Sequence, residues 1–416
     1  MAGKNSAAAA YLDTSFSYPV RDPVWGNIML SPGFKKIVSS PVLQKMNRIK
    51  QLGPTYLVYP GAVHTRFIHS LGVYHIGYRM IRRLLAIDSC PSLSEADVKA
   101  FLCACLLHDL GHFPYTHSLK ELPLKKHEAL TGEYIMAEPL ASLIRDALEI
   151  DPAVPAAIVD TSLPTESATV QFFRNILSGS LDPDKLDYLT RDAWFCGVPY
   201  GTQDIEFVLS AIYPHPEKGI SILPAGIPAV ENILFSKYLM YKTVYWHKAV
   251  RCATGMIKKA IIAALDSHLL TPQDLYGLDD ESLFLTGKGG SDLRLFDMVH
   301  SRQLFKMTYE VVFDDSNPEH TALLDLKKRG AAEKALAEKL SGTGIECDSS
   351  CVIIDVPEHI TFETTLPVFE NGSFRTFSGS RGLENFSDPL RRLRVFVDPA
   401  VFDSIKSAGL KDFRWI

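Results

Sequence analysis

The sequence predicts a mainly helical protein with a smaller α+β lobe at its C-terminal end. Apolar residues recur at helical spacing from about residue 21 to about residue 300, and strand-like alternating runs appear beyond that point. With 416 residues, 46 % of them hydrophobic, the chain can bury a large core. We therefore expect a flexible tail over residues 1–20, a helical body over 21–300 and an α+β lobe over 301–416.

Within the body, helices are expected where apolar side chains repeat every three or four positions. Phe67–Met80 and Val98–Leu106 show this repeat. Another helix is predicted over Pro183–Ala193, because Asp182 can cap it and proline suits a first helical turn. Two further elements are expected in the body: a short strand over Gly219–Pro224 and a long helix over Ile233–Ile262.

The lobe is expected to combine strands with one charged helix. Lys306–Phe313 alternates and is rich in Tyr, Val and Phe, which favours a strand. Leu323–Leu340 is typical of an amphipathic helix with a solvated charged face. Further strands are predicted over Cys351–Val356 and Leu393–Val397.

Charge, cysteine use and hydropathy limit the setting in which the protein acts. A formal charge of −5 gives no basic footprint, so nucleic acid is not expected as an obligatory partner. The seven cysteines form no CxxC pair, which indicates free thiols in a reducing compartment. The first ten residues lack the apolar core of a signal peptide, and the longest apolar run, Ala100–Leu107, is too short to span a bilayer. We expect a cytoplasmic protein without a membrane partner.

The pair His108-Asp109 directly follows this apolar run, so it is predicted to lie at the end of a buried helix. An imidazole and a carboxylate side by side offer one nitrogen and one oxygen ligand to a divalent metal. His112 lies four residues further on, one helical turn away, and is expected to face the same cleft.

Two other segments carry residues suited to the same chemistry. In His64–His69, Arg66 and His69 share a helical face, which places a phosphate-binding guanidinium beside a candidate metal ligand. In Asp182–Asp192, the side chains of residues 184, 188 and 192 share a face, and Asp184 is a candidate ligand. Asp187 is interpreted as part of a solvated acidic face. Two imidazoles and two carboxylates suit Mn, Fe, Ni, Co or Zn better than Mg.

The order H…HD…D resembles that of the HD-domain metal-dependent phosphohydrolases, in particular the branch of deoxynucleoside triphosphate (dNTP) triphosphohydrolases. Seven ordered blocks carry this resemblance: Asp22–Ile28, Arg48–Gly53, Tyr59–Ala62, His64–Val73, His108–His117, His127-Glu128 and Asp184–Asp192. The resemblance implies an HD-type helical body that cleaves dNTPs to deoxynucleoside and intact triphosphate through a metal-activated water.

The resemblance also implies roles for individual residues. One divalent transition metal is expected on His69, His108, Asp109 and Asp184, with Mg accompanying the substrate phosphates. Catalytic roles are expected for Asp109, His112, His117 and His127, and substrate contacts for Gln51, Arg66, Lys185, Tyr188, Asp192, Lys237 and Tyr245. Relatives assemble as dimers or tetramers, so a homo-oligomer that binds a nucleotide is expected.

The chain departs from the family pattern at several positions. Ile68 and Lys120 stand where acids are usual, and Lys237 replaces an Arg that binds phosphate. Ser39 and Asn47 replace the Asp and Arg that bind a guanine-nucleotide activator in regulated members, so that site is not transferred. Three alternatives therefore stay open: hydrolysis of a nucleoside monophosphate or cyclic nucleotide, a di-iron oxygenase in which His112 and His127 add ligands, and a weakly active nucleotide-binding regulator.

Overall fold

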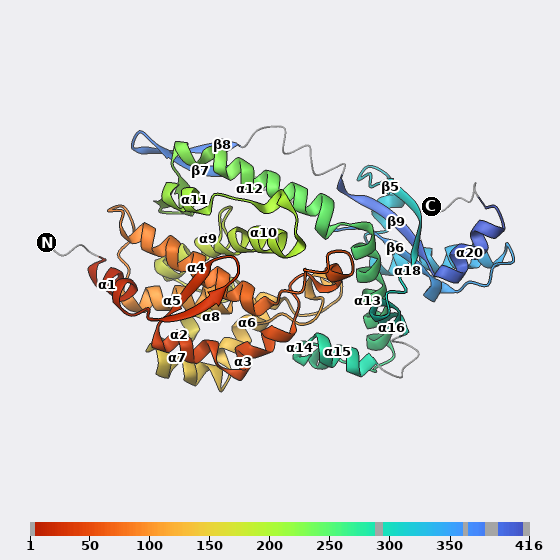
Figure 1. The fold of residues 1–416 in the computed structure, drawn as a ribbon, viewed down its shortest axis with the longest axis horizontal. Helices are drawn as coiled ribbons and strands as arrows, with labels where there is room; N and C mark the ends of the chain where they lie inside the picture. The colour runs from red at the N-terminus through yellow and green to blue at the C-terminus, as the bar shows by residue number, and fades with distance from the viewer. Residues whose placement is uncertain (1–4, 288–293, 361–364, 379–389, 411–416) are drawn as a thin grey trace.

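The computed structural model describes residues 5–287, 294–360, 365–378 and 390–410. It is elongated, with a larger helical body at one end and a smaller mixed lobe at the other (Figure 1). The mainly helical fold with a C-terminal α+β lobe is confirmed. None of the helices in the described ranges combines the length and the apolar character that crossing a membrane requires.

The body is formed by consecutive helices, several of which pack around two of them, α4 (Arg66–Leu85) and α5 (Glu95–Leu107). The other helices are α1 (Ser6–Thr14), α2 (Pro32–Val38), α3 (Pro41–Gln44), α6 (His127–Met136), α7 (Leu140–Leu148), α8 (Ala153–Val159), α9 (Ala168–Leu177), α10 (Pro183–Cys196), α11 (Ile205–Ala211) and α12 (Ile227–Met240). Helix α4 packs against α5 and α10, and the side chains of residues 100–107 of α5 are buried, as the apolar run predicts. These three helices form the frame on which the candidate metal ligands lie.

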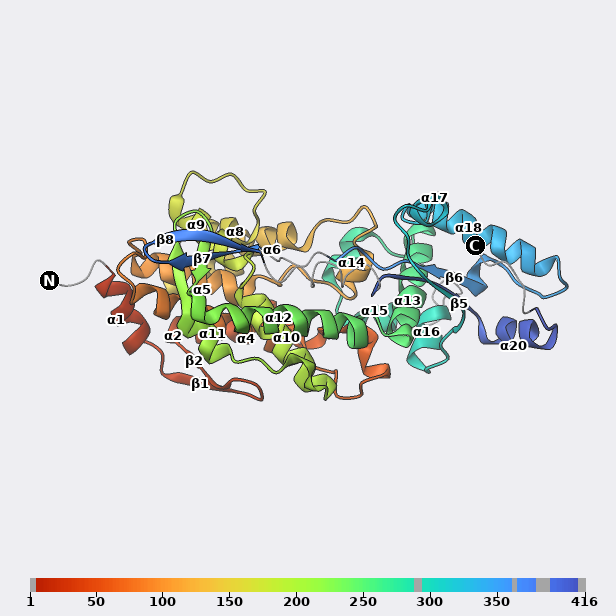
Figure 2. The same ribbon diagram turned by 90° about the horizontal axis from the view of Figure 1, so that it is seen from above.

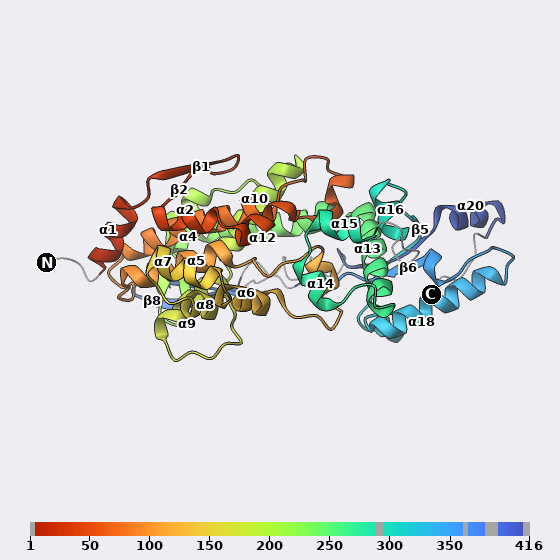
Figure 3. The same ribbon diagram turned by 90° about the horizontal axis from the view of Figure 1, so that it is seen from below.

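Residues 6–14 form a helix and residue 18 begins a strand, which corrects the expectation of a flexible tail for this part of residues 1–20; residues 1–4 lie outside the described residues. Alanine favours helix, and in α1 both Ala8 and Leu12 are buried against the body. Next, β1 (Tyr18–Asp22) and β2 (Gly26–Leu30) form an antiparallel hairpin, in which Tyr18 pairs with Leu30. Figure 3 shows this hairpin on the outside of the body, near α10.

The long helix expected over Ile233–Ile262 is broken, which corrects the sequence prediction. Helix α12 continues into a π-helical turn, η6 (Tyr241–Tyr245), and a new helix, α13 (Lys248–Asp266), follows. The break lies at His247, whose backbone is extended and whose Nδ1 accepts a hydrogen bond from the Ala249 N–H. Shorter 3₁₀ turns complete the connections: η1 (Lys45–Arg48), η2 (Gly53–Leu57), η3 (Thr116–Leu119), η4 (Pro199–Gly201), η5 (Pro224–Gly226) and η8 (Ser349–Cys351).

The lobe contains a three-stranded sheet in the order β5-β9-β6 with helices around it. The strands expected at residues 306, 351 and 393 and the charged helix are present. The elements of this part are α14 (Pro272–Gly277), α15 (Asp280–Gly287), α16 (Arg294–His300), β5 (Lys306–Val312), α17 (Pro318–Ala322), α18 (Leu326–Ser341), β6 (Val352–Asp355), β9 (Arg392–Val397) and α20 (Pro399–Ser407). Figure 2 shows α17, α18 and α20 at the end of the molecule away from α1.

One hairpin of the C-terminal region leaves the lobe and packs on the body. Strands β7 (Thr365–Glu370) and β8 (Ser373–Ser378) join β3 (Ile212–His215) and β4 (Gly219–Ile222) in a four-stranded sheet, with Ile222 beside Val368 in a parallel pair. Figure 1 shows the hairpin next to α11 and α12. In the other direction, α13 shares a buried core with residues of β6 and β9. Packing therefore crosses the predicted boundary at residue 300, and the division into domains there stays a prediction.

Candidate metal centre and its pocket

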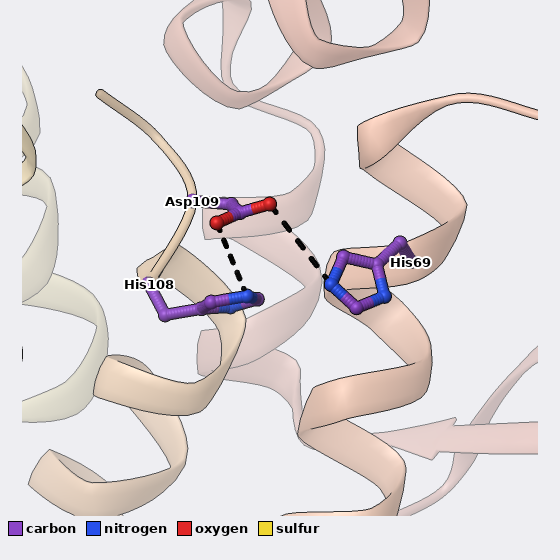
Figure 4. A group of neighbouring side chains, drawn as sticks. All are labelled: His69, His108 and Asp109. Atoms are coloured by element: carbon purple, nitrogen blue, oxygen red, sulfur yellow. Dashed lines mark ion pairs between the residues drawn. The ribbon is translucent and has the colours of Figure 1, made fainter. Parts of the chain in front are cut away.

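Three candidate ligands converge between α4 and the end of α5. His69 lies in the first turns of α4, His108 is the C-cap of α5, and Asp109 follows it (Figure 4). The Asp109 carboxylate lies 3.9 Å from His69 Nε2 and 3.4 Å from His108 Nε2. One ligand atom from each residue lies within 4.8 Å of the others, so this group could hold a metal ion.

Both imidazoles are oriented by a hydrogen bond at the opposite nitrogen. His69 Nδ1 lies 2.8 Å from Asp187 Oδ2, and His108 Nδ1 lies 3.0 Å from the backbone oxygen of Cys105. Since both partners are acceptors, each Nδ1 carries a proton, and each Nε2 is the nitrogen that can bind a metal once it is unprotonated. The two Nε2 atoms are buried and make no hydrogen bond within the described residues. Buried polar atoms without a partner are costly, so a metal bound between them fits the site.

The fourth candidate ligand comes from the start of α10, where Asp182 caps the helix as predicted. Asp184 Oδ1 lies 3.0 Å from His69 Nε2 and 3.8 Å from His108 Nε2. Burial favours the neutral form of His69, but Asp184 and Asp187 outweigh this effect and raise the pKa of His69 to about 10. The negative charge of these carboxylates therefore attracts a cation to His69 Nε2, either a proton or a metal ion that displaces it. Coordination by these four residues stays a prediction.

Asp187 is not part of a solvated face, which corrects the sequence interpretation. Its side chain is fully buried and accepts hydrogen bonds from Arg191 Nε at 2.8 Å and Nη2 at 2.9 Å, in addition to its contact with His69. Burial opposes ionisation, but Arg191 and His69 hold the pKa of Asp187 well below its usual range. The sequence signal that was missed is Arg191, one helical turn after Asp187.

A second histidine group lies beside the first. His112 Nε2 and His117 Nε2 are 3.2 Å apart, and the ring centroids of His112 and His127 are 4.0 Å apart. Asp109, His112 and His127 form another set of ligand atoms that could hold a metal. Arg66 Nη1 donates a hydrogen bond of 2.5 Å to Asp109 Oδ2. The four residues expected to catalyse are thus brought together.

These groups open into a cavity of about 710 Å³. All of the predicted substrate contacts line it: Gln51, Arg66, Lys185, Tyr188, Asp192, Lys237 and Tyr245. Asp192 accepts hydrogen bonds of 2.7 Å from Tyr245 Oη and from His64 Nε2, a role for His64 that the sequence did not reveal. Sequence reasoning also missed the far wall, which the lobe supplies through Val356 and residues 358–360.

Comparisons with known proteins agree with this geometry. The family model of the HD domain matches residues 66–154, and that of the HD associated region matches residues 214–410. A solved structure of a hypothetical protein from Aquifex aeolicus superposes with a TM-score of 0.73 at 26 % identity, covering 94 % of this chain and 99 % of that one. A phosphohydrolase from Bacteroides thetaiotaomicron has the same fold, with a TM-score of 0.72, 22 % identity and coverage of 92 % and 100 %.

Curated relatives share a smaller part of their length. An uncharacterized protein of Methanocaldococcus jannaschii is 33 % identical over 302 residues, which are 72 % of this chain and 61 % of that protein. Deoxynucleoside triphosphate triphosphohydrolase SAMHD1 of Homo sapiens is 25 % identical over 325 residues, which are 71 % of this chain and 50 % of that protein. The chain thus spans half to three fifths of the length of these relatives. The chain carries an HD domain and an HD associated region, and it is similar to a protein named as a dNTP triphosphohydrolase.

Proposed function

We propose that this protein is a metal-dependent phosphohydrolase that acts on nucleotides and cleaves dNTPs to deoxynucleoside and triphosphate. The observation that carries the proposal is the pair of buried Nε2 atoms on His69 and His108, which meet Asp109 and Asp184 beside a cavity of about 710 Å³. A relative named as a dNTP triphosphohydrolase supports the choice of substrate.

The residues around this centre fit phosphoryl chemistry. A divalent metal bound there supplies a water of lowered pKa and neutralises charge on phosphoryl oxygens. Arg66 and Lys185 line the cavity, and their cationic N–H groups suit phosphate oxygens. The imidazoles of His112, His117 and His127 can accept or donate the protons that the reaction moves.

The opposite part of the cavity suits a sugar. Asp192 is fixed by Tyr245 and His64, and the Gln51 Oε1 atom is buried without a hydrogen-bond partner among the described residues. A sugar hydroxyl would satisfy such an acceptor, and a ligand without the hydroxyl would leave it unpaired. These contacts support a nucleotide over a simple phosphate ester.

The test is a substrate and metal panel. Purified protein is incubated with Mn, Fe, Ni, Co or Mg and with dNTPs, NTPs, dNMPs and cyclic nucleotides, and products are separated by ion exchange. We expect triphosphate from dNTPs and none from the Asp184→Ala variant. Cleavage of only a monophosphate or cyclic nucleotide would refute the dNTP assignment and keep the phosphohydrolase. The oligomeric state can be measured on the same preparations. A homo-oligomer and a cytoplasmic location both stay predictions.

The second ligand group favours one alternative, oxygen activation by two irons. Asp109 belongs to both candidate groups, so it could bridge two metals with His112 and His127 on the second. This alternative requires two equivalents of iron per chain and oxygen consumption, whereas the proposed hydrolase requires one equivalent of tightly bound metal. Metal analysis of the purified protein separates the two.

A further inference from the structure

The cations that line the cavity differ in how their charge is balanced. Five of them each form an ion pair with a carboxylate: Lys50 with Asp280 at 3.5 Å, Arg66 with Asp109 at 2.5 Å, Lys185 with Asp182 at 2.7 Å, Arg251 with Asp355 at 2.5 Å and Lys258 with Glu121 at 2.8 Å. Lys120 also lines the cavity, and within the described residues no carboxylate pairs with it. Its positive charge is therefore uncompensated in the absence of a ligand.

The backbone around Lys120 is fixed on both sides. Leu119 is the last residue of η3 and is buried in the apolar core that α13 shares with β6 and β9. Glu121 accepts hydrogen bonds of 2.8 Å from Arg329 Nη2 and from Lys258 Nζ. The backbone position of Lys120 is thus fixed by its two neighbours. Its exposed side chain lies at the wall of the cavity.

Lys120 lies close to the histidine group, near enough to His117 and His127 to act on both electrostatically. Asp109 Oδ1 is 3.2 Å from His112 Nδ1, and His112 Nε2 is 3.2 Å from His117 Nε2. Lys120 follows His117 by one turn, and desolvation, Arg66 and Lys120 together lower the pKa of His117. The Lys120 ammonium therefore adds positive charge on the side of the cavity that His117 and His127 line.

We infer that Lys120 binds a phosphate group beyond the one that is attacked, so that the site selects nucleoside di- and triphosphates over monophosphates. The inference rests on the proposed function, because it takes the attacked phosphorus to lie at the metal centre. A single phosphate there leaves Lys120 without a partner, whereas a phosphate chain running past His117 pairs with it.

The decisive experiment compares Lys120→Ala, Lys120→Glu and Lys120→Arg with Lys126→Ala. Lys126 is an exposed lysine nearby that does not line the cavity, so it controls for the loss of one charge. Calorimetry measures binding of inorganic triphosphate and of phosphate, and steady-state kinetics are measured with a dNTP and a dNMP. We expect Lys120→Ala to weaken triphosphate binding and raise KM for the dNTP roughly 10-fold, as for one lost charge-assisted contact.

We expect Lys120→Glu to weaken triphosphate binding more than Lys120→Ala does, and Lys120→Arg and Lys126→Ala to behave as the wild type. In all four variants, kcat and the binding of phosphate should change little. Unchanged triphosphate binding in Lys120→Ala, or an equal loss of phosphate and triphosphate, overturns the inference. If no nucleotide is cleaved but triphosphate binding still depends on Lys120, the inference stands and the proposed reaction fails. If dNTPs are cleaved but Lys120→Ala binds triphosphate as the wild type does, the proposed reaction stands and the inference about Lys120 fails.

Discussion

The geometry of the candidate metal centre depends on a buried carboxylate, Asp187, that is not itself a predicted ligand. Asp187 orients His69 and is itself held by Arg191, whose Nη1 also donates a hydrogen bond of 2.8 Å to Asp22 of the N-terminal hairpin. Gly72 of α4 leaves the space for it, because a Cβ at position 72 would lie 1.8 Å from Asp187 Oδ1. The orientation of one imidazole is thus set by residues of β1, α4 and α10.

We predict that Asp187→Asn lowers metal affinity by about 10- to 100-fold, the usual effect of removing an acceptor behind a metal-binding imidazole. The amide lacks the charge that favours a proton on His69 Nδ1, so Nε2 loses basicity. Metal content after dialysis against graded chelator measures the change.

Asp160→Asn is the matched control, since Asp160 is also buried and its side chain accepts hydrogen bonds from Ser162. Circular dichroism checks that both variants fold. Equal metal affinity in a folded Asp187→Asn protein would contradict the assignment. Gly72→Ala tests the same contact from α4 and should lower metal affinity in the same direction.

At the scale of elements, the segment between η3 and α6 connects the site to the lobe. It carries Lys120 and directly follows His117 of η3, and Glu121 ties it to Lys258 of α13 and Arg329 of α18. Although burial opposes ionisation, Arg329 and Lys258 lower the pKa of Glu121 from 4.5 to about 2. Glu121 therefore links two helices of the C-terminal half to the segment that follows the histidine group.

We predict that Glu121→Gln lowers the free energy of unfolding by about 2–3 kcal/mol at pH 7. The pKa of Glu121 is lower in the folded state, so its stabilising effect is fully present above pH 4.5 and is lost as the pH falls toward 2. The difference between wild type and variant should shrink over the same range. Urea unfolding at several pH values measures it, and a difference independent of pH would refute the linkage.

The elements that could be predicted from the sequence are those with local signals. The apolar run of α5 and the Asp182 cap of α10 place His108, Asp109 and Asp184 correctly at helix ends. The burial of α1 depends on contacts with other elements, which a local pattern does not contain, and the break at His247 is marked only by a cap from its own side chain. For Asp187, Arg191 in the same helix was a local signal, whereas its hydrogen bond from Trp25 comes from a distant part of the chain and could not be predicted from a local pattern.

At the scale of the whole molecule, body and lobe are joined by segments far apart in the sequence. The lobe supplies one wall of the cavity, and the β7–β8 hairpin returns to pair with β4, so that Val368 is buried in the body core. The parallel pairing of residues 222 and 368 cannot be predicted from the sequence of either segment alone. The sequence therefore indicated two parts but not that they share a site.

We predict that the chain unfolds in one calorimetric transition, because body and lobe share the hairpin, α13 and the cavity. Val368→Asp places a charge in the core and should lower the Tm of that single transition by more than about 5 °C. Thr376→Asp adds the same charge at an exposed position of β8 and should change the Tm little.

Chelation of the metal should lower the wild-type Tm by on the order of 5 °C, since a ligand that binds only the folded state at 100 times its Kd adds about 2.7 kcal/mol. Two resolved transitions, of which only one responds to the chelator, would show that the lobe folds independently and that the hairpin is a surface addition.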